Sequence, residues 1–387
     1  MQNKALEKWE ECKICDCCEV YQPQTISTKE MVENGAYPVF GANGQIGKYD
    51  NYNHEDAEVL VTCRGATCGS INMSLPKSWI NGNAMVISPK KNDIDKIYLF
   101  YFLKNIDFSN YISGAAQPQI TRVGLSPLVI KYPDLSEQQR LVKILDEAFE
   151  NIEKAKQNAL QNLNNAKELF ESYLKEYFEI TKNTWQKYKL SEITTKIGSG
   201  ATPLGGKKAY IDCGISLIRS MNVYDREFIY EGLAHISEIQ AKQLDVVTIQ
   251  EKDVLLNITG ASVARCCVVP NDVIPARVNQ HVSIIRPKQE IILSKFLCYL
   301  LTSNYYKNIL LKDGAEGGAT RQALTKTGLE QFEVYIPKTL EEQQKIVTQL
   351  DELQEQTKKL EQIYEQRIKD LDELKQSILQ KAFNGEL

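Results

Sequence analysis

Long apolar runs are absent from this 387-residue sequence, and so is a strong excess of charge of either sign. A membrane-spanning helix needs about 20 consecutive apolar residues, and no stretch approaches that length. The opening residues MQNKALEKWEE are too polar to form the apolar core of a secretory signal. We therefore expect a cytoplasmic protein. The net charge of −4 argues against a large basic tail, although it does not exclude DNA binding.

Metal ligands are also scarce. The sequence has three histidines, His54, His235 and His281, and they stand apart from one another. Ten cysteines include a cluster between Cys12 and Cys18, but no second CxxC or HxxxH pair follows it. The cluster is therefore only half of a zinc site, and we expect reduced thiols that act as small apolar residues rather than a metal centre.

Catalytic motifs are missing as well. GSGATPLGGKK at 198–208 fails the phosphate-loop pattern, because Lys207 is followed by another lysine rather than by Ser or Thr. FGANGQIG at 40–47 lacks the dinucleotide fingerprint and predicts a polar, glycine-rich loop between strands. The sequence contains no Asp/Asn-Pro-Pro-aromatic tetrapeptide and no paired nucleophile and histidine. We expect a chain that is not itself an enzyme.

One passage, by contrast, occurs twice. LSEQQRLVKILDE begins at Leu135, LEEQQKIVTQLDE begins at Leu340, and the two copies match at a constant offset for more than 40 residues. Each follows a helix-start signal, a cap residue at Asp134 or Thr339 with a glutamate three positions later. Two helices of about 45 residues, each about 65 Å long, are too long for a small domain.

Within both copies, apolar residues recur at alternating steps of four and three, the 3.5-residue period of a coiled coil. Asn162 and Arg367 interrupt the pattern at equivalent positions, where polar residues tend to fix the register. We predict that the helices pair antiparallel as a rigid spacer; two separate helices, each bundled with its own domain, are the alternative. The predicted seam comprises Leu141, Leu145, Ile152, Asn162, Leu169 and Tyr173 with Ile346, Leu350, Leu360, Arg367, Leu374 and Ile378.

The segments before the two helices are related more loosely. VLVTCRGAT from Val59 aligns with VLLNITGAS from Val254, and both are typical of a buried strand that runs into a glycine turn. GAAQPQITRVGL from Gly114 aligns with GATRQALTKTGL from Gly318. Strands, turns and short helices are mixed, which predicts an α+β fold with two related domains and pseudo-two-fold symmetry. The expected segments are domains at 1–134 and 183–339 and spacer helices at 135–182 and 340–387.

This arrangement resembles the DNA-specificity subunit of a type I restriction-modification system. The resemblance rests on the SEQQ and EEQQ helix starts, on GAAQPQIT and GATRQALT, on TTKIGSGATP followed by GISLIRSMNV, and on the terminal AFNGEL. It implies two target-recognition domains that each read one half of a bipartite, asymmetric DNA site, with paired helices that set the spacer and dock two methyltransferase subunits. It further implies restriction subunits as partners, S-adenosylmethionine and ATP with Mg in the partner subunits, and no cofactor in this chain. The cysteine pattern and the lack of long apolar runs lead us to expect neither a metal site nor a membrane contact.

DNA contacts are expected where polar side chains leave the scaffold on loops, because Arg, Lys, Asn and Gln bind base edges and phosphates. A solvated surface side chain is the alternative for each. Since GAAQPQIT and GATRQALT recur in both domains, they favour structural or phosphate-binding roles, and Arg64, Gln45 and Arg219 rank above Gln119 as base readers. The candidates are Asn43, Gln45, Lys48, Arg64, Gln117, Gln119, Thr121 and Arg122 in the first domain, and Lys207, Lys208, Arg219, Asn222, Thr259, Arg265, Arg277, Asn279, Arg321 and Gln322 in the second.

A second hypothesis is a structural coiled-coil scaffold whose globular domains bind protein or glycan partners. Salt-dependent DNA binding would favour the first hypothesis, because phosphate contacts release counterions and give a steep salt dependence.

Overall fold

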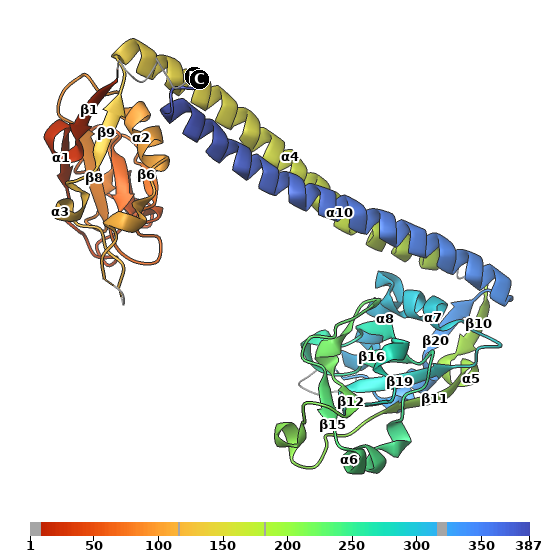
Figure 1. Cartoon of the computed structure of the whole chain (residues 1–387). Coiled ribbons are helices and arrows are strands. Elements are labelled where there is room, and N and C mark those ends of the chain that lie inside the picture. The colour runs from red at the N-terminus through yellow and green to blue at the C-terminus, as the bar shows by residue number, and fades with distance from the viewer. Residues whose placement is uncertain (1–8, 115–116, 182, 316–322) are drawn as a thin grey trace. The chain divides into compact units, whose positions relative to one another are not determined.

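The computed structural model describes residues 9–114, 117–181, 183–315 and 323–387. The chain forms two compact units: unit 1 comprises residues 1–160 and 365–387, and unit 2 comprises residues 161–364. Two long helices, α4 (Leu135–Thr181) and α10 (Leu340–Phe383), each contribute one part to each unit (Figure 1). The boundaries expected near 134 and 339 mark where these helices begin, whereas the compact units divide within them.

The described residues of unit 1 form three small sheets. Strand orders are β2-β8-β5-β6, β4-β3-β7 and β1-β9. β5 is buried along its whole length, as its run of apolar residues predicts. The elements before α4 are β1 (Glu10–Lys13), α1 (Ile14–Cys17), β2 (Cys18–Tyr21), β3 (Tyr37–Gly41), β4 (Gly44–Tyr49), β5 (Val59–Thr62), β6 (Ile71–Met73), β7 (Trp79–Ile80), β8 (Ala84–Pro89), α2 (Lys96–Lys104), α3 (Arg122–Leu125) and β9 (Val129–Tyr132).

Unit 2 repeats this plan with additions. Strand orders are β11-β19-β16-β17, β15-β12-β18, β10-β20 and β13-β14. The elements between the long helices are β10 (Gln186–Lys189), α5 (Leu190–Ile193), β11 (Thr194–Ser199), β12 (Ile215–Ile218), β13 (Val223–Tyr224), β14 (Glu227–Phe228), β15 (Ala234–Ile236), α6 (Glu238–Gln243), β16 (Val254–Asn257), β17 (Cys266–Val268), β18 (Ala276–Val278), β19 (Val282–Pro287), α7 (Ser294–Thr302), α8 (Asn304–Ala315), α9 (Lys326–Gln331) and β20 (Glu333–Ile336).

The two units correspond sheet by sheet. β2-β8-β5-β6 and β11-β19-β16-β17 are both four-stranded and antiparallel throughout. Each second sheet contains one parallel pair, β3 with β7 and β12 with β18. The α+β fold with two related domains is therefore confirmed. The FGANGQIG segment covers the end of β3, a turn at residues 42–43 and the start of β4, so the predicted loop is a tight hairpin turn between longer strands.

The long helices begin at their predicted caps. Asp134 Oδ1 accepts the Glu137 backbone N–H at 3.0 Å before α4, and Thr339 Oγ1 accepts that of Glu342 at 3.2 Å before α10. A side-chain acceptor at this position satisfies an N–H that the first helical turn leaves free. Both sequence signals therefore mark real helix starts.

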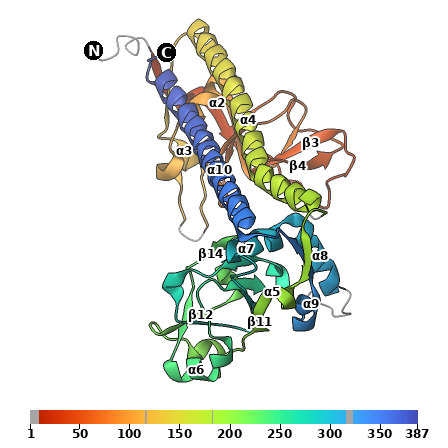
Figure 2. The ribbon, with the colours of Figure 1, turned by 90° about the vertical axis from the view of Figure 1, so that its right-hand side faces the viewer.

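The predicted antiparallel pairing of α4 and α10 is confirmed (Figure 2). In unit 1, Leu141 near the start of α4 shares a core with Phe383 at the end of α10. In unit 2, Phe178 near the end of α4 shares a core with Ile346 near the start of α10. An ion pair between Lys156 Nζ and an Asp372 carboxylate oxygen, 2.6 Å apart, also joins the helices.

The buried stripe of α4 departs from the predicted seam after Ala159. The structure buries Leu163, Ala166 and Phe170 next, whereas Asn162 and Leu169 are exposed. The step from Ala159 is four residues rather than three because the end of α4 packs into the core of unit 2 as well as against α10. The residues before that step are buried as predicted: Leu141, Leu145 and Ile152.

In α10 the predicted seam is buried near the helix start, and Ile378 near the helix end packs, partly buried, against the core of unit 1. Ile346 and Leu350 lie in the core of unit 2, whereas Leu360, Arg367 and Leu374 are exposed. The polar interruption at Arg367 therefore faces solvent instead of the partner helix. Toward its end α10 turns a different set of side chains, Leu379, Ala382 and Phe383, into the core of unit 1.

Candidate nucleic-acid interface

The turn from β5 to β6 (residues 63–70) and the turn from β16 to β17 (residues 258–265) share one backbone conformation, and we call them the matched turns. In the first, Gly65 and Gly69 have φ angles of +92° and +91°. The equivalent residues in the second, Gly260 and Ala264, have φ angles of +78° and +67°. Left-handed backbone at both equivalent positions is rarely accidental, because side chains disfavour it.

Both matched turns are fastened to a later segment of their own unit. Arg64 forms an antiparallel backbone bridge with Gln119, and the equivalent Thr259 forms one with Ala323. These bridges link the glycine turns to the GAAQPQIT and GATRQALT segments that the sequence repeats. The backbone is thus a common frame, and the side chains on it differ between the units.

In unit 1, the structure brings the hairpin turn between β3 and β4 to the matched turn. Asn43 Oδ1 accepts a hydrogen bond from the hydroxyl of Thr67. Gln45 and Lys48 lie exposed on β4. Arg64 is exposed and its guanidinium donates no hydrogen bond to any residue in the described part of the chain. The glycine loop and the matched turn therefore form one polar surface.

Another candidate in unit 1 has a structural role. Thr121 Oγ1 accepts the Gly124 N–H at 3.0 Å and caps α3, and Thr325 makes the same bond to Gly328 before α9. This hydroxyl therefore caps a helix in both units, and the DNA contact predicted for Thr121 stays a prediction. The remaining candidates of this segment are exposed: Gln117, Gln119 and Arg122.

A groove follows the matched turn of unit 2. Its larger part has a volume of about 660 Å³ and its smaller part about 260 Å³, and Ser220, Met221 and His281 line both. Tyr224, Thr259 and Arg265 belong to the larger part, and Thr202, Tyr210 and Arg219 to the smaller.

A cation–π contact and two hydrogen bonds of a histidine order the larger part of the groove. The Arg265 guanidinium lies over the Tyr224 ring, 4.3 Å from its centroid. His281 is held at both nitrogens, with Nδ1 2.6 Å from Thr259 Oγ1 and Nε2 2.9 Å from Gln280 Nε2. An amide nitrogen donates, so Nε2 accepts and Nδ1 carries the hydrogen that points to Thr259. The groove therefore presents an ordered edge of donors and acceptors.

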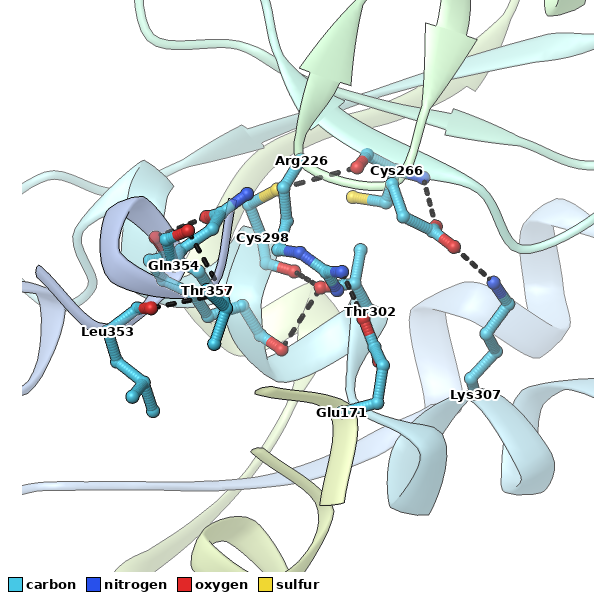
Figure 3. Close-up of polar contacts among 11 residues, drawn as sticks. Glu171, Arg226, Cys266, Cys298, Thr302, Lys307, Leu353, Gln354 and Thr357 are labelled. Atoms are coloured by element: carbon cyan, nitrogen blue, oxygen red, sulfur yellow. Dashed lines mark hydrogen bonds and ion pairs between the residues drawn. The ribbon is translucent and has the colours of Figure 1, made fainter. Parts of the chain in front are cut away.

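The hairpin that carries Tyr224 is braced against two helices (Figure 3). Arg226 forms an ion pair with Glu171 of α4, and only 12% of its side chain is exposed. Asp225 accepts Lys307 Nζ of α8 at 2.5 Å. These contacts fix β13 and β14, and with them the ring on which Arg265 lies.

Three candidates in unit 2 are buried, and each makes side-chain hydrogen bonds within the unit. Arg277 donates to a backbone carbonyl at 3.0 Å and to Asp245 Oδ1 at 2.6 Å. Asn222 and Asn279 each accept a backbone N–H at 3.0 Å. A buried polar side chain needs such partners, so burial favours structural roles for Arg277 and Asn222, whereas Asn279 also lines the smaller part of the groove. The DNA contacts predicted for these three residues stay predictions.

Arg219 is an intermediate case. One of its terminal nitrogens donates to a backbone carbonyl, and its guanidinium lies 5.3 Å from the Tyr210 ring centroid. Lys207 and Lys208 are exposed on a short turn of 3-10 helix. The last two candidates lie outside the described residues: Arg321 and Gln322.

Sequence reasoning missed Tyr224, Met221 and His281. His281 immediately precedes the apolar strand β19, so its place at the start of a strand was a usable signal. The other two follow LIRS in a segment that has no counterpart in the first domain, and nothing in the sequence placed them beside residues 259–265.

Two thiols of the cysteine cluster have raised pKa values. Burial and a hydrogen bond to Cys17 raise the pKa of Cys12 to about 12, and a hydrogen bond to Cys18 together with burial raises that of Cys17 further. Both thiols stay protonated at neutral pH. Within the described ranges no three His, Cys, Asp or Glu side chains converge as metal ligands, and no helix has the length and apolar character to cross a membrane.

The chain is similar to known proteins in sequence and in fold. A family model of the type I restriction modification DNA specificity domain matches residues 6–162 and again 182–370. A putative type I restriction enzyme specificity subunit of Haemophilus influenzae is 30% identical over 116 residues, which is 29% of this chain and only 30% of that protein. The MjaVIII specificity subunit of Methanocaldococcus jannaschii is 24% identical over 336 residues, 79% of this chain and 77% of that protein. One solved chain, reported for the assembly and conformational transition of the type I R-M system, has the same fold, with a TM-score of 0.75 at 19% identity over 98% of both chains.

Proposed function

Because the chain belongs to the family of type I restriction modification DNA specificity domains, we propose that it is a sequence-specific DNA-binding subunit in which each unit reads one half of a bipartite, asymmetric site. The matched turns carry this proposal. They repeat one backbone frame in both units and place different side chains on it, which suits two readers of two different half-sites. The polar surface around Arg64 and the groove around Arg265 supply the donors and acceptors that base edges and phosphates require.

The long helices are proposed to set the spacer between the half-sites and to dock two methyltransferase subunits. Leu169 of α4 and Leu374 of α10 occupy equivalent positions in the repeat, and their side chains are 50% and 47% exposed. Tyr173, one turn after Leu169, is also 41% exposed. Apolar side chains exposed at the same place in both copies of a repeat suit two copies of one partner.

Catalysis is assigned to the partners. We place S-adenosylmethionine in the methyltransferase subunits, ATP with Mg in the restriction subunits, and adenine-N6 methylation and DNA cleavage in the assembled cytoplasmic complex. The present chain supplies the sequence specificity. A structural scaffold that binds protein or glycan partners is the alternative, and it offers no reason for cationic and amide side chains to gather at the matched turns.

A domain exchange tests the proposal. Residues 1–134 are replaced by the first domain of another family member, the complex is formed with its methyltransferase subunits, and methylated sites are mapped by sequencing. We expect one half of the recognised sequence to change and the other to stay. A change in both halves, or an unchanged site, would exclude modular reading, and the absence of salt-dependent DNA binding would favour the scaffold.

A further inference from the structure

The matched turns differ most where each carries its arginine. In unit 1 the arginine stands at the beginning of the turn, at Arg64, and Ser70 stands at the end. In unit 2 the order is reversed, with Thr259 at the beginning and Arg265 at the end. Since the backbone frame is the same, the two units present a guanidinium at opposite ends of one scaffold. A shared backbone of this kind can contact different bases when the position of one side chain changes.

Arg265 differs from the other described arginines of residues 183–339. Arg219, Arg226, Arg277 and Arg286 each donate to a backbone carbonyl or a carboxylate of the protein. The guanidinium of Arg265 donates to no residue that the structure describes, and it lies in the groove on the face of an aromatic ring. Its five N–H donors are therefore ordered but unused.

Resting on the function proposed above, we propose that Arg265 reads a guanine in the half-site of unit 2 and that Tyr224 positions its guanidinium for that contact. Stacking on the Tyr224 ring fixes the plane of the Arg265 guanidinium. Two parallel N–H groups of that guanidinium match O6 and N7 of guanine in the major groove. Ser262 and Thr259, beside it on the same turn, are small enough to let a base edge approach. The brace of Arg226 on Glu171 keeps the Tyr224 hairpin in place.

The test uses the full chain in complex with its methyltransferase subunits. The probe is a set of duplexes that carry the methylated site found by sequencing, with each base pair of the unit 2 half-site replaced in turn. For Arg265→Ala we expect the affinity for the intact site to fall on the order of 10- to 100-fold. Duplexes that lack one particular G·C pair should bind the variant and the unchanged protein equally.

Matched variants separate charge, geometry and stability. Arg265→Lys keeps the positive charge but lacks the two parallel N–H donors of a guanidinium. Specificity at the G·C pair should therefore relax while binding to unrelated DNA persists. Tyr224→Phe keeps the ring and should bind normally, whereas Tyr224→Ala should lose affinity at the same base pair as Arg265→Ala. Lys242→Ala, an exposed change on α6, serves as the control.

Two results would overturn the inference. One is a unit 2 half-site without any G·C pair, and the other is an equal loss of affinity for Arg265→Ala whichever base pair is replaced, which is the behaviour of a phosphate contact. Failure of the underlying function would look different. In that case exchanging residues 183–339 would leave the methylated sequence unchanged, whatever residue stands at 265.

Discussion

Two buried glutamines show how single residues attach the units to the long helices. Gln343, one turn into α10, is fully buried, accepts the Leu293 N–H at 2.9 Å and donates to the Ile291 carbonyl at 2.9 Å. Gln138 in α4 makes the same pattern with the Asp95 N–H at 2.7 Å and the Asp93 carbonyl at 2.8 Å. In both units the glutamine satisfies the backbone just before the apolar helix, α7 or α2. The second glutamine of each motif, Gln139 in SEQQ and Gln344 in EEQQ, is exposed instead.

We predict that Gln343→Ala destabilises unit 2 by about 2 to 4 kcal/mol, because it leaves a buried N–H and a buried carbonyl without partners. The neighbouring exposed change Gln344→Ala should stay within about 0.5 kcal/mol. Urea unfolding followed by tryptophan fluorescence compares the two. Equal stability of both variants would show that water replaces the missing amide.

At this scale the sequence identified residue types better than residue roles. Arg64 and Arg265 were candidates and lie exposed or partly exposed on the matched turns, but Arg277 and Asn222 had the same chemistry and are buried. A guanidinium in a sequence does not reveal whether a carboxylate will fold against it. Asp245, the partner of Arg277, lies 32 positions earlier, in a turn that no local pattern marks.

The same limit governs the phase of the helix stripes. After Ala159 the sequence offers two apolar stripes on α4, one through Asn162 and Leu169 and one through Leu163 and Phe170. A strict 3.5-residue period selects the first, but a straight α-helix has 3.6 residues per turn and drifts from that seam. The core of unit 2 takes in Phe170 of the second stripe, whereas Asn162 and Leu169 of the first stripe are exposed.

The β13–β14 hairpin is the element that most clearly distinguishes unit 2. The contribution of the Arg226–Glu171 ion pair to its stability can be measured. Arg226 and Glu171 are 12% and 34% exposed, so removing the arginine leaves a partly buried carboxylate unpaired. We predict that Arg226→Ala costs about 1 to 3 kcal/mol, less than for a fully buried pair because solvent reaches Glu171. A double-mutant cycle with Glu171→Ala should give a coupling near 1 kcal/mol.

The ion pair between Lys358 and Glu227 provides the comparison, since both side chains are more than half exposed and 3.8 Å separates their charged atoms. A double-mutant cycle on this pair should give a coupling energy close to zero. Additive effects of Arg226→Ala and Glu171→Ala would mean that the hairpin is held by its backbone and Lys307 alone.

For the whole molecule, the stoichiometry of the complex follows from the repeat. We predict that Leu169→Asp and Leu374→Asp each remove one methyltransferase subunit and that the double variant removes both, because a charge at an exposed apolar contact must be desolvated on docking. Native mass spectrometry of the copurified complex counts the subunits. Asn165→Asp adds the same charge at another exposed position of α4 and should leave two copies bound. Loss of both copies from either single variant would contradict two equivalent sites.

The final prediction concerns the helices as a ruler. The divisions between the compact units fall at 160/161 in α4 and 364/365 in α10, next to Asn162 and Arg367. Duplicating residues 156–162 and 361–367 therefore lengthens both helices while the cores of the two units stay intact. Seven residues preserve the heptad phase and add about 10 Å to each helix at 1.5 Å per residue.

That extension corresponds to at most about 3 base pairs of duplex at 3.4 Å each, and to fewer where the helices are inclined to the DNA or the duplex bends. We expect sequencing of methylated DNA to show a longer spacer between unchanged half-sites, because no reading turn has moved within its own unit. Duplicating only residues 156–162 mismatches the two helices and should abolish methylation at the site. An active variant with both duplications and the original spacer would mean that the distance between half-sites is set outside the helix pair.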